Sequence, residues 1–465
     1  MAYTVDQSSG TGVQGAYDEI FYVVRDTVNY NDPKFRYLLK VTIDGTVVGT
    51  FKQLPNNNDC AVFLIEQIVS SYVHQDDNIW FLGKELQDGT LSTTKIFSRN
   101  LDAIKTVLVD FGYEKAADAD SAPTETWGAA AQASFKVING SIRSQSHDAD
   151  DTNSAAAFGM INSNGAFITT LYKNQPGSIA EQYVDEDQWG AMAFLNGDDV
   201  GSDDPNYFHV TFYNSAGVAQ ETGYFQNNST NGGYTPAAGL SDGRSLIYFG
   251  CFPANLDSQT IDADLKPSTI QWDYYDVQAA SSTTLSGNEA SQIYRFHKLC
   301  SNRYTEVSKG VFPGTYQLVW WNELGGVDNL IFDGASNVSQ QIKRETYYSI
   351  GGNAFNAGNT IDYNRRPNEG GTTSAGNQTT TSITLNTREQ NPEALSGLIM
   401  SLASSPRVHI SIAQQVQQSD ILGKGVQFVR CVITDMSVSY STAVNDKIAN
   451  YTITVQISRR RPNNR

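Results

Sequence analysis

The chain of 465 residues is 40% hydrophobic and 17% charged, and its formal net charge is −17 at pH 7. The hydrophobic fraction excludes a disordered protein, and the length predicts about three domains. The acidic balance argues against a protein that wraps nucleic acid, because counterion release requires a surface lined with Lys and Arg. No apolar stretch approaches the roughly 18 residues of a membrane span.

The chain ends and the cysteines bear on location. The first residues lack the basic and apolar regions of a secretory signal. The basic residues Arg459, Arg460 and Arg461 predict either a solvated tail, which we favour, or a subunit-contact tail that touches DNA or an acidic partner. Four cysteines lie far apart without C-x-x-C spacing, which favours buried thiols in a reducing cytoplasm: Cys60, Cys251, Cys300 and Cys431.

Period-two alternation predicts strands through the N-terminal part, beginning with residues 19–25. A hairpin follows over residues 35–54, in which an apolar residue stands at every second position from Phe35 to Ile43. Asp44-Gly45 supplies the two-residue turn that such hairpins favour. Residues 61–73 fit either a strand or a short amphipathic helix.

The middle of the chain begins with residues 116–133, which have the composition of a linker or a long excursion. Short strands separated by turn signals follow, as is typical of sandwiches and barrels. Two of them, at 207–213 and 218–224, flank a polar turn and predict a second hairpin. The other predicted strands are 106–113 before the linker, then 135–138, 167–172, 191–195, 245–252 and 269–277.

The most informative segment is YQLVWWNELGGVDNLIF, residues 316–332. An alternating run with bulky residues on both faces predicts a buried strand, a Gly-Gly step permits a turn with positive φ, and a second apolar run returns from it. We therefore expect a buried hairpin. Its structural residues are Tyr316, Trp320, Trp321, Asn322, Gly325, Gly326, Asp328 and Phe332.

The C-terminal part combines a long polar segment with one clear helix. Residues 351–381 are rich in Gly, Asn and Thr, the composition of a long mobile loop or arm. A helix is predicted near 392–404, because Asn391 can cap it, Pro392 suits its first turn, and apolar residues recur at helical spacing from Leu395. Strands are predicted at 343–350, 408–412, 426–434, 436–440 and 451–457.

These signals predict a mainly β protein of several β-sandwich or Greek-key domains with few short helices. The expected domains are an N-terminal sandwich over 1–115, a middle β domain over 116–285 that is a candidate insertion, and a C-terminal β domain over 286–465.

Residues 316–332 resemble the W-x-N-x-x-G-G-x-D-x-x-x-F element of large β-rich virion proteins of tailed bacteriophages, of the marine and crAss-like type. The opening module of that family is similar to EIFYVVRDTV together with FRYLLKVTIDGTVVGTFKQLP. A following strand of the family resembles TVLVDFGYEK. Its closing hairpin resembles FVRCVITDMSVSYS together with NDKIANYTITVQIS. These segments cover about a third of the chain. The resemblance implies a neck, ring, collar, tail or baseplate subunit, and it implies no catalytic residues.

Motifs for chemistry are weak. Residues 10–15 match G-x-G-x-x-G, but a dinucleotide site needs a helix after the glycines and here a strand is predicted, so we expect a flexible arm. Acidic clusters at 147–151, 185–187 and 198–204 could bind Ca²⁺, although solvated turns explain them better. The five histidines show no metal-binding spacing. We expect no cofactor, no metal site and no enzymatic activity.

One aromatic run has two interpretations. Trp272, Tyr274 and Tyr275 are candidate glycan-facing residues, because WDYYD joins aromatic rings to carboxylates. The alternative is that these rings fill a sandwich core.

We therefore predict a structural component of a tailed-phage virion, made in the host bacterial cytoplasm. It is expected to be a neck or tail ring subunit, or a tail-associated one, that assembles with copies of itself and with other portal, neck or tail proteins. The 351–381 segment and both termini are expected to reach a neighbouring subunit. A receptor- or glycan-binding tail protein is the first alternative, and a β-rich polysaccharide hydrolase with paired carboxylates is the second.

Overall fold

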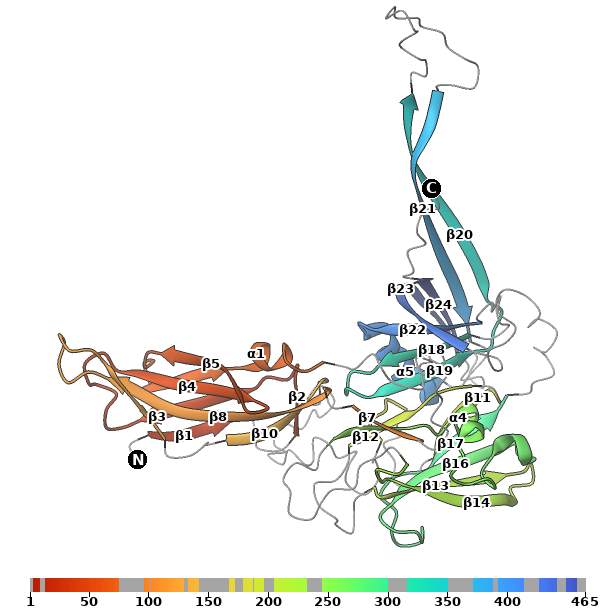
Figure 1. Cartoon of the computed structure of the whole chain (residues 1–465), viewed down its shortest axis with the longest axis horizontal. Coiled ribbons are helices and arrows are strands. Elements are labelled where there is room, and N and C mark those ends of the chain that lie inside the picture. The colour runs from red at the N-terminus through yellow and green to blue at the C-terminus, as the bar shows by residue number, and fades with distance from the viewer. Residues whose placement is uncertain are drawn as a thin grey trace, which may run out of the picture.

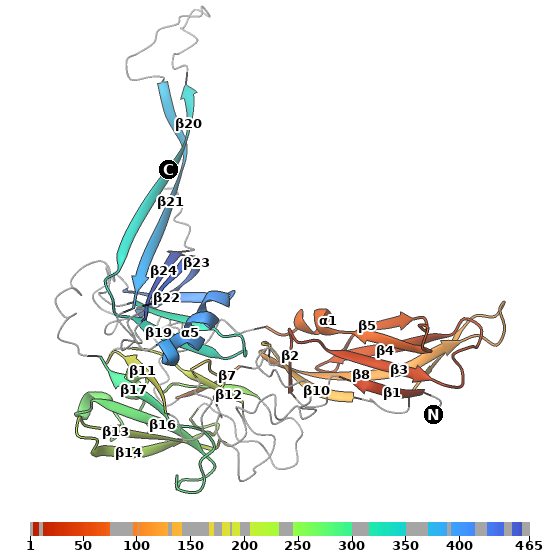
Figure 2. The ribbon, with the colours of Figure 1, turned by 180° about the vertical axis from the view of Figure 1, so that it is seen from behind.

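The computed structural model is shown from two sides in Figures 1 and 2. It describes a mainly β protein with several separate sheets and few short helices, which confirms the predicted fold class. The described residues are 3–8, 13–74, 96–100, 102–128, 133–141, 167–171, 179–186, 188–195, 205–231, 245–299, 316–349, 371–387, 392–413, 426–440 and 449–457.

The N-terminal part is a sandwich of two sheets. Side chains from both sheets, such as Tyr22, Leu39 and Phe111, form one buried cluster between them. One sheet has the order β1 (Tyr3–Ser8), β3 (Phe21–Asp26), β6 (Cys60–Leu64). The other has the order β2 (Val13–Gly15), β10 (Ala133–Ile138), β8 (Ile104–Lys115), β4 (Arg36–Ile43), β5 (Thr46–Gln53), and β9 (Thr124–Trp127) pairs with β8.

The first predicted hairpin is confirmed, since β4 pairs antiparallel with β5 across Asp44-Gly45. These two turn residues have positive φ, 45° and 78°, as a type I′ turn requires. The ambiguous segment 61–73 divides between β6 and helix α1 (Glu66–Ser70). Strands β9 and β10 lie beyond the expected boundary at residue 115 and still pair with β8, so this sheet continues to Ile138.

A second sandwich packs a five-stranded sheet against a three-stranded sheet. The predicted second hairpin is confirmed by antiparallel pairing of β13 with β14. The five-stranded sheet has the order β11 (Ala180–Val184), β17 (Tyr294–Lys298), β16 (Tyr274–Ala280), β13 (Tyr207–Tyr213), β14 (Ala219–Gln226). The other has the order β12 (Met192–Leu195), β15 (Leu246–Phe249), β7 (Phe97–Asn100). The short helices α4 (Pro253–Ser258) and η2 (Pro267–Thr269) follow β15.

The C-terminal part is a seven-stranded sheet with one helix. Its order is β19 (Val327–Phe332), β18 (Tyr316–Trp321), β22 (Val408–Ala413), β23 (Val426–Tyr440), β24 (Ala449–Ile457), β21 (Gly371–Asn386), β20 (Asn337–Ser349). Helix α5 (Pro392–Ser404) confirms the predicted helix. The expected loop over 351–381 is wrong for residues 371–381, which belong to β21; residues 351–370 lie outside the described residues.

The hairpin of β18 and β19 is buried at every residue, as predicted from the sequence. Leu318 and Trp320 on one face belong to the large core shared with the middle sandwich. Trp321 on the other face belongs to a second cluster, which includes Ile104 and Ile138 of the N-terminal sandwich. The hairpin therefore lies where the three parts of the chain meet.

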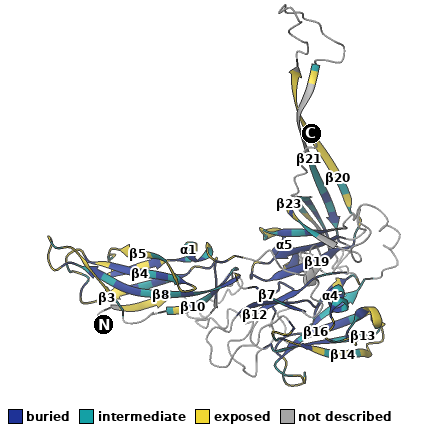
Figure 3. Cartoon of the chain, in the orientation of Figure 1, coloured by how far each residue is buried: buried dark blue, intermediate teal, exposed yellow. Residues whose placement is uncertain are grey.

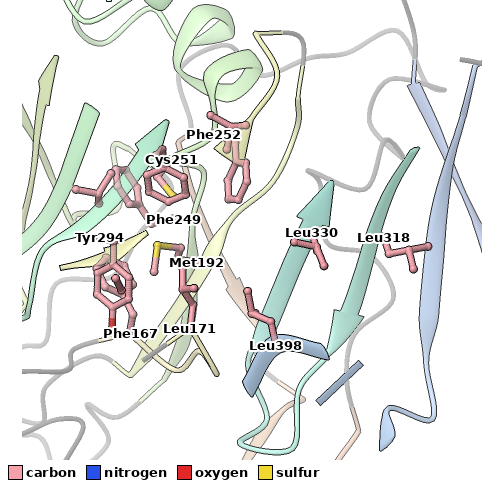
Figure 4. Packing of buried hydrophobic residues seen from close by; sticks show 14 of the residues in the cluster. Phe167, Leu171, Met192, Phe249, Cys251, Phe252, Tyr294, Leu318, Leu330 and Leu398 are labelled. Atoms are coloured by element: carbon pink, nitrogen blue, oxygen red, sulfur yellow. The ribbon is translucent and has the colours of Figure 1, made fainter. Parts of the chain in front are cut away.

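The figures show how the shared core is built. In Figure 4, Leu318 and Leu330 of the hairpin and Leu398 of α5 lie in one core with Met192 and Phe249 of the middle sandwich. Figure 3 shows buried residues in the sheets of the N-terminal sandwich and around this core, and exposed residues along β20.

Truncation of the hairpin should therefore destabilise the whole chain. Trp320 is fully buried, and its indole Nε1 donates to Ser401 Oγ at 3.2 Å. We expect Trp320→Ala to lower the free energy of unfolding by about 3–5 kcal/mol, measured by urea denaturation, because a large buried side chain leaves a cavity. Met400→Ala, on the same helix as Ser401 but 68% exposed, is the control and should cost less than about 0.5 kcal/mol. Similar losses in both variants would contradict a central role for the hairpin.

Candidate interaction sites

The turn of the β18–β19 hairpin is organised by Asn322. Its Oδ1 accepts hydrogen bonds from the N–H groups of Leu324 and Gly326 at 3.1 and 2.8 Å. Its Nδ2 donates to the carbonyl of Ile168 at 3.0 Å. A Cβ on Gly326 would lie 2.0 Å from that same carbonyl oxygen, so glycine is required at this position. The Asn and the Gly thus form a single contact with the 167–171 segment.

Asp328 is the second polar residue that fixes this hairpin. Its carboxylate accepts from Thr169 Oγ1 at 2.5 Å and from Thr170 at both Oγ1 and N, at 2.5 and 3.1 Å. Burial raises the pKa of the Asp328 carboxyl above its ordinary value, and these hydrogen bonds offset part of that increase. The side chain is 2% exposed, so it serves as an internal connection between two segments far apart in the chain.

The same turn holds the N-terminal sandwich. Ser141 N–H donates to the Glu323 carbonyl at 2.6 Å. A Cβ on Gly140 would lie 2.4 Å from the Leu324 carbonyl carbon, so the two backbones are in close contact. Leu324 also packs in the cluster that contains Ile104 and Ile138. The predicted structural residues of the hairpin therefore do lie together, and they connect domains.

The partners of this hairpin could not be identified from the sequence. Thr169 and Thr170 are separated from Asp328 by 159 and 158 positions. Residues 167–171 form an irregular segment with one isolated bridge at Phe167, not the predicted strand, and a Thr-Thr step there carries no sign that its hydroxyls contact a distant carboxylate. Only Asn322, Gly325 and Gly326 gave a local signal, because they form the turn itself.

Strands β20 and β21 form a long arm. Their first pair is Asn337 with Thr384 and their last pair is Ser349 with Gly371. Strand β24, in contrast, pairs only with residues 382–386 of β21. We use the name β20–β21 arm for residues 340–349 and 371–381, which form a ribbon beyond the rest of the sheet (Figures 1 and 2). The side chains of Ile342, Tyr347 and Tyr348 are 55%, 51% and 66% exposed.

The outer face of the five-stranded sheet carries a row of four rings. The strand register aligns Tyr183, His297, Tyr274 and Tyr213 across four neighbouring strands. Their successive ring centroids lie 5.4, 5.7 and 4.8 Å apart. Arg295 lies over the Tyr274 ring at 4.4 Å and makes two hydrogen bonds, of 2.7 and 2.8 Å, to Asp276. The row forms a partly exposed aromatic surface, and the guanidinium beside it is already paired with Asp276.

The predicted glycan-facing residues are corrected by burial. Trp272 is 2% exposed and Tyr275 is fully buried, so neither ring can contact an external sugar. Trp272 packs against Phe212 and Tyr275 in the core, as the alternative interpretation expected. Tyr274 alone of the three is half-exposed, because within β16 it points to the face opposite Tyr275.

The structure describes only some of the remaining segments that the sequence analysis named. The expected flexible arm over residues 10–15 is wrong at its end, because residues 13–15 form β2 and pair with β10. Glu186 of the acidic cluster at 185–187 makes an ion pair with Lys298. The clusters at 147–151 and 198–204, Cys300, and the tail with Arg459, Arg460 and Arg461 lie outside the described residues.

The described part of the chain contains neither a metal-binding cluster nor a membrane-spanning helix. No group of three or more His, Cys, Asp or Glu side chains there is placed to hold a metal ion. No helix among those residues is long and apolar enough to cross a membrane.

Comparisons with known proteins gave only remote likenesses. No family model and no curated protein matches the chain. A chain from the tail of an empty gene transfer agent particle with C6 symmetry is similar over 27% of this chain and 78% of that one, at 9% identity and a TM-score of 0.18. A chain from the virion of a native gene transfer agent particle is similar over 27% and 79%, at 9% identity and a TM-score of 0.17. Extracellular domains 3–5 of Drosophila OTK match over 83% and 92%, at 9% identity and a TM-score of 0.17. TM-scores this low carry no argument about function.

The buried Asp328 should give a measurable pH dependence. Because its pKa is raised in the folded state, the folded chain binds more protons than the unfolded chain as pH rises through and above the ordinary value of 3.8, so the contribution of Asp328 to stability falls as pH rises. The difference in unfolding free energy between the wild type and Asp328→Asn should shrink by about 1.4 kcal/mol for each unit of the pKa increase. Urea midpoints between pH 3.5 and 8 measure this difference. A difference that grows with pH would contradict the raised pKa.

Proposed function

We propose that this chain is a structural subunit of a tailed-phage virion, which assembles through protein–protein contacts as part of a neck or tail ring. The observation that carries this proposal is the β20–β21 arm. The arm projects from a well-packed body, and the arm itself exposes apolar side chains. The sequence resemblance of residues 316–332 to virion proteins supports the same assignment. Its partners are copies of itself and other virion proteins, and no catalytic role is part of the proposal.

The arm is expected to be only marginally stable when no other protein covers it. A two-stranded ribbon without a core is marginally stable in water, because few side chains are removed from solvent. Exposed Ile342, Tyr347 and Tyr348 add apolar surface, and tyrosine is among the residues enriched at the centres of protein interfaces. A neighbouring protein that covers the arm would stabilise the ribbon and bury these side chains.

The root of the arm is firmly held, which suits a mechanical role. Val338 at the start of β20 packs against the large core, and its partner Ile383 on β21 is fully buried. Ile383 in turn pairs with Val455 of β24. A load on the arm therefore passes directly into the seven-stranded sheet and its shared core.

Shortening the arm tests the proposal. Residues 341–380 are replaced by Asn-Gly, which joins the paired residues Gln340 and Thr381 through a favourable turn. We expect a folded monomer with an unchanged urea midpoint and no higher assemblies, measured by light scattering on size-exclusion peaks and by negative-stain images.

The control changes an exposed turn elsewhere, with Ser215→Gly and Ala216→Gly in the β13–β14 loop. This variant should assemble as the wild type does. Normal assembly of the shortened chain would overturn the proposal.

The ring row supports a second candidate, a receptor- or glycan-binding tail protein. Tyr183 is 49% exposed at one end of the row, and Arg295 is already paired with Asp276, so the face fits an uncharged polar ligand such as a neutral glycan. On a glycan array, Tyr183→Ala should lose binding that Tyr224→Ala, 43% exposed on the same sheet but outside the row, retains. No binding by the wild-type chain would remove this candidate.

A further inference from the structure

We infer that the β20–β21 arm of one copy docks on strand β6 of a second copy and adds β20 as a new strand to the sheet β1–β3–β6. This inference rests on the proposed subunit role and names the contact that would build the assembly. It requires a receiving edge, an arm that can pair with that edge, and a geometry in which the arm of one copy does not reach strand β6 of the same copy.

Strand β6 is an edge strand that is open beyond Cys60, whose backbone N–H and carbonyl are already bonded to Asn56 at 3.2 and 2.8 Å. It lies at the end of the sheet order β1–β3–β6 and, among the described strands, pairs with β3 alone. Its sequence, CAVFL, contains no charged residue and no proline. Edge strands of soluble monomers usually carry such residues because these discourage pairing with another chain. The β6 edge lacks these protective residues and is therefore open to the addition of a strand from a partner.

The solvent side of this edge is apolar as well. Val62 and Leu64 are 40% and 55% exposed. Val62 lies opposite Val23 on β3, and Leu64 lies opposite Phe21. We call these four residues the β6 strip. Both β3 residues are half-buried, so the strip forms a continuous apolar patch on a sheet face that points away from the sandwich core.

The arm offers the complementary features. β20 is the outermost strand of the seven-stranded sheet, and within the described part of the chain it pairs only with β21. Its other edge therefore has backbone groups available for pairing. Ile342, 55% exposed in the middle of β20, supplies an apolar side chain beside that edge. Backbone pairing combined with side-chain contacts is the mode of recognition known as strand addition.

Charge favours a second copy of this chain as the partner. The strands of the arm carry Lys343, Arg344 and Glu345, a net charge of +1. Residues 1–141, which contain the receiving sandwich, hold 18 acidic and 11 basic side chains, a net charge of −7. The arm and the part of the chain that contains the β6 strip therefore carry opposite net charges, which favours their encounter although the whole chain carries −17.

The shape of the molecule makes the contact intermolecular. Figures 1 and 2 both show the arm and the N-terminal sandwich projecting from the body in different directions, with their far ends well apart. The arm and the β6 strip are different surfaces, so the contact is heterologous. Such a contact repeats from copy to copy and produces a closed ring or a helical filament.

The test places charge on the receiving edge. Val62→Lys combined with Leu64→Lys should abolish assembly, because both side chains are exposed in the free chain and would be buried against the arm. The matched control, Val28→Lys with Leu54→Lys, adds the same charge at residues that are 69% and 63% exposed in the same sandwich, outside the strip, and should assemble as the wild type does. Light scattering on size-exclusion peaks measures the mass, and urea midpoints check folding.

A mixing experiment makes the prediction sharper. The arm-shortened chain keeps the β6 strip, and the Val62→Lys, Leu64→Lys chain keeps the arm. Each should be monomeric alone, and together they should form a one-to-one dimer and nothing larger, since only one heterologous contact is possible. A mixture that stays monomeric overturns the inference.

The remaining outcomes separate this inference from the proposed function. Normal assembly of the Val62→Lys, Leu64→Lys chain, together with loss of assembly in the arm-shortened chain, overturns the docking site and leaves the subunit role standing. A wild-type chain that is monomeric at its highest soluble concentration contradicts self-docking. Normal assembly of both altered chains contradicts the proposed function itself.

Discussion

The burial of the β18–β19 hairpin on both faces is the constraint on which the rest of the fold depends. One face closes the large core of the middle and C-terminal parts, and the other closes the cluster against the N-terminal sandwich. A strand buried on both faces cannot use the usual alternation of apolar and polar residues. Every polar side chain on it must find a partner inside the protein, because an unpaired buried polar group costs about 1–3 kcal/mol.

Most polar side chains of the hairpin meet this requirement by binding other segments, and the buried indole Nε1 of Trp321 is an exception. Gln317 Nε2 donates to the Trp189 carbonyl at 2.6 Å and to Asn329 Oδ1 at 3.0 Å. Asn329 Nδ2 donates to the Ala191 carbonyl at 3.0 Å. Strand β19 is an outermost strand of its sheet, and the bond from Asn329 connects it to the Ala191 segment of the middle sandwich. The opposite edge strand, β20, differs from β19 because it extends beyond the sheet into an exposed arm. This asymmetry separates a static side of the sheet from a side available for contacts.

Sequence patterns gave the local structure well and the long-range contacts poorly. The hairpin at Asp44-Gly45 was predictable because its register is set by two adjacent residues with positive φ. Strand β21 was missed because its Gly, Ser, Asn and Thr residues suggest a loop, whereas its order comes from cross-strand pairing with β20. The face of Trp272 was also unpredictable. It precedes β16, which begins at Tyr274, so the period-two rule that places Tyr274 outside does not apply to it.

The weak net charge of the arm limits the electrostatic part of the binding free energy in such an assembly. A net charge of +1 acts over only about 8–10 Å at physiological ionic strength, so attraction to an acidic sandwich aids encounter more than it adds affinity. The binding free energy must then come from backbone pairing and from a few apolar side chains, which gives a modest affinity for one contact. In a closed ring, however, each subunit is held by two contacts, and loss of a subunit requires both to break. The second contact is effectively intramolecular, so a ring built from individually modest contacts can be long-lived while its free subunits stay soluble.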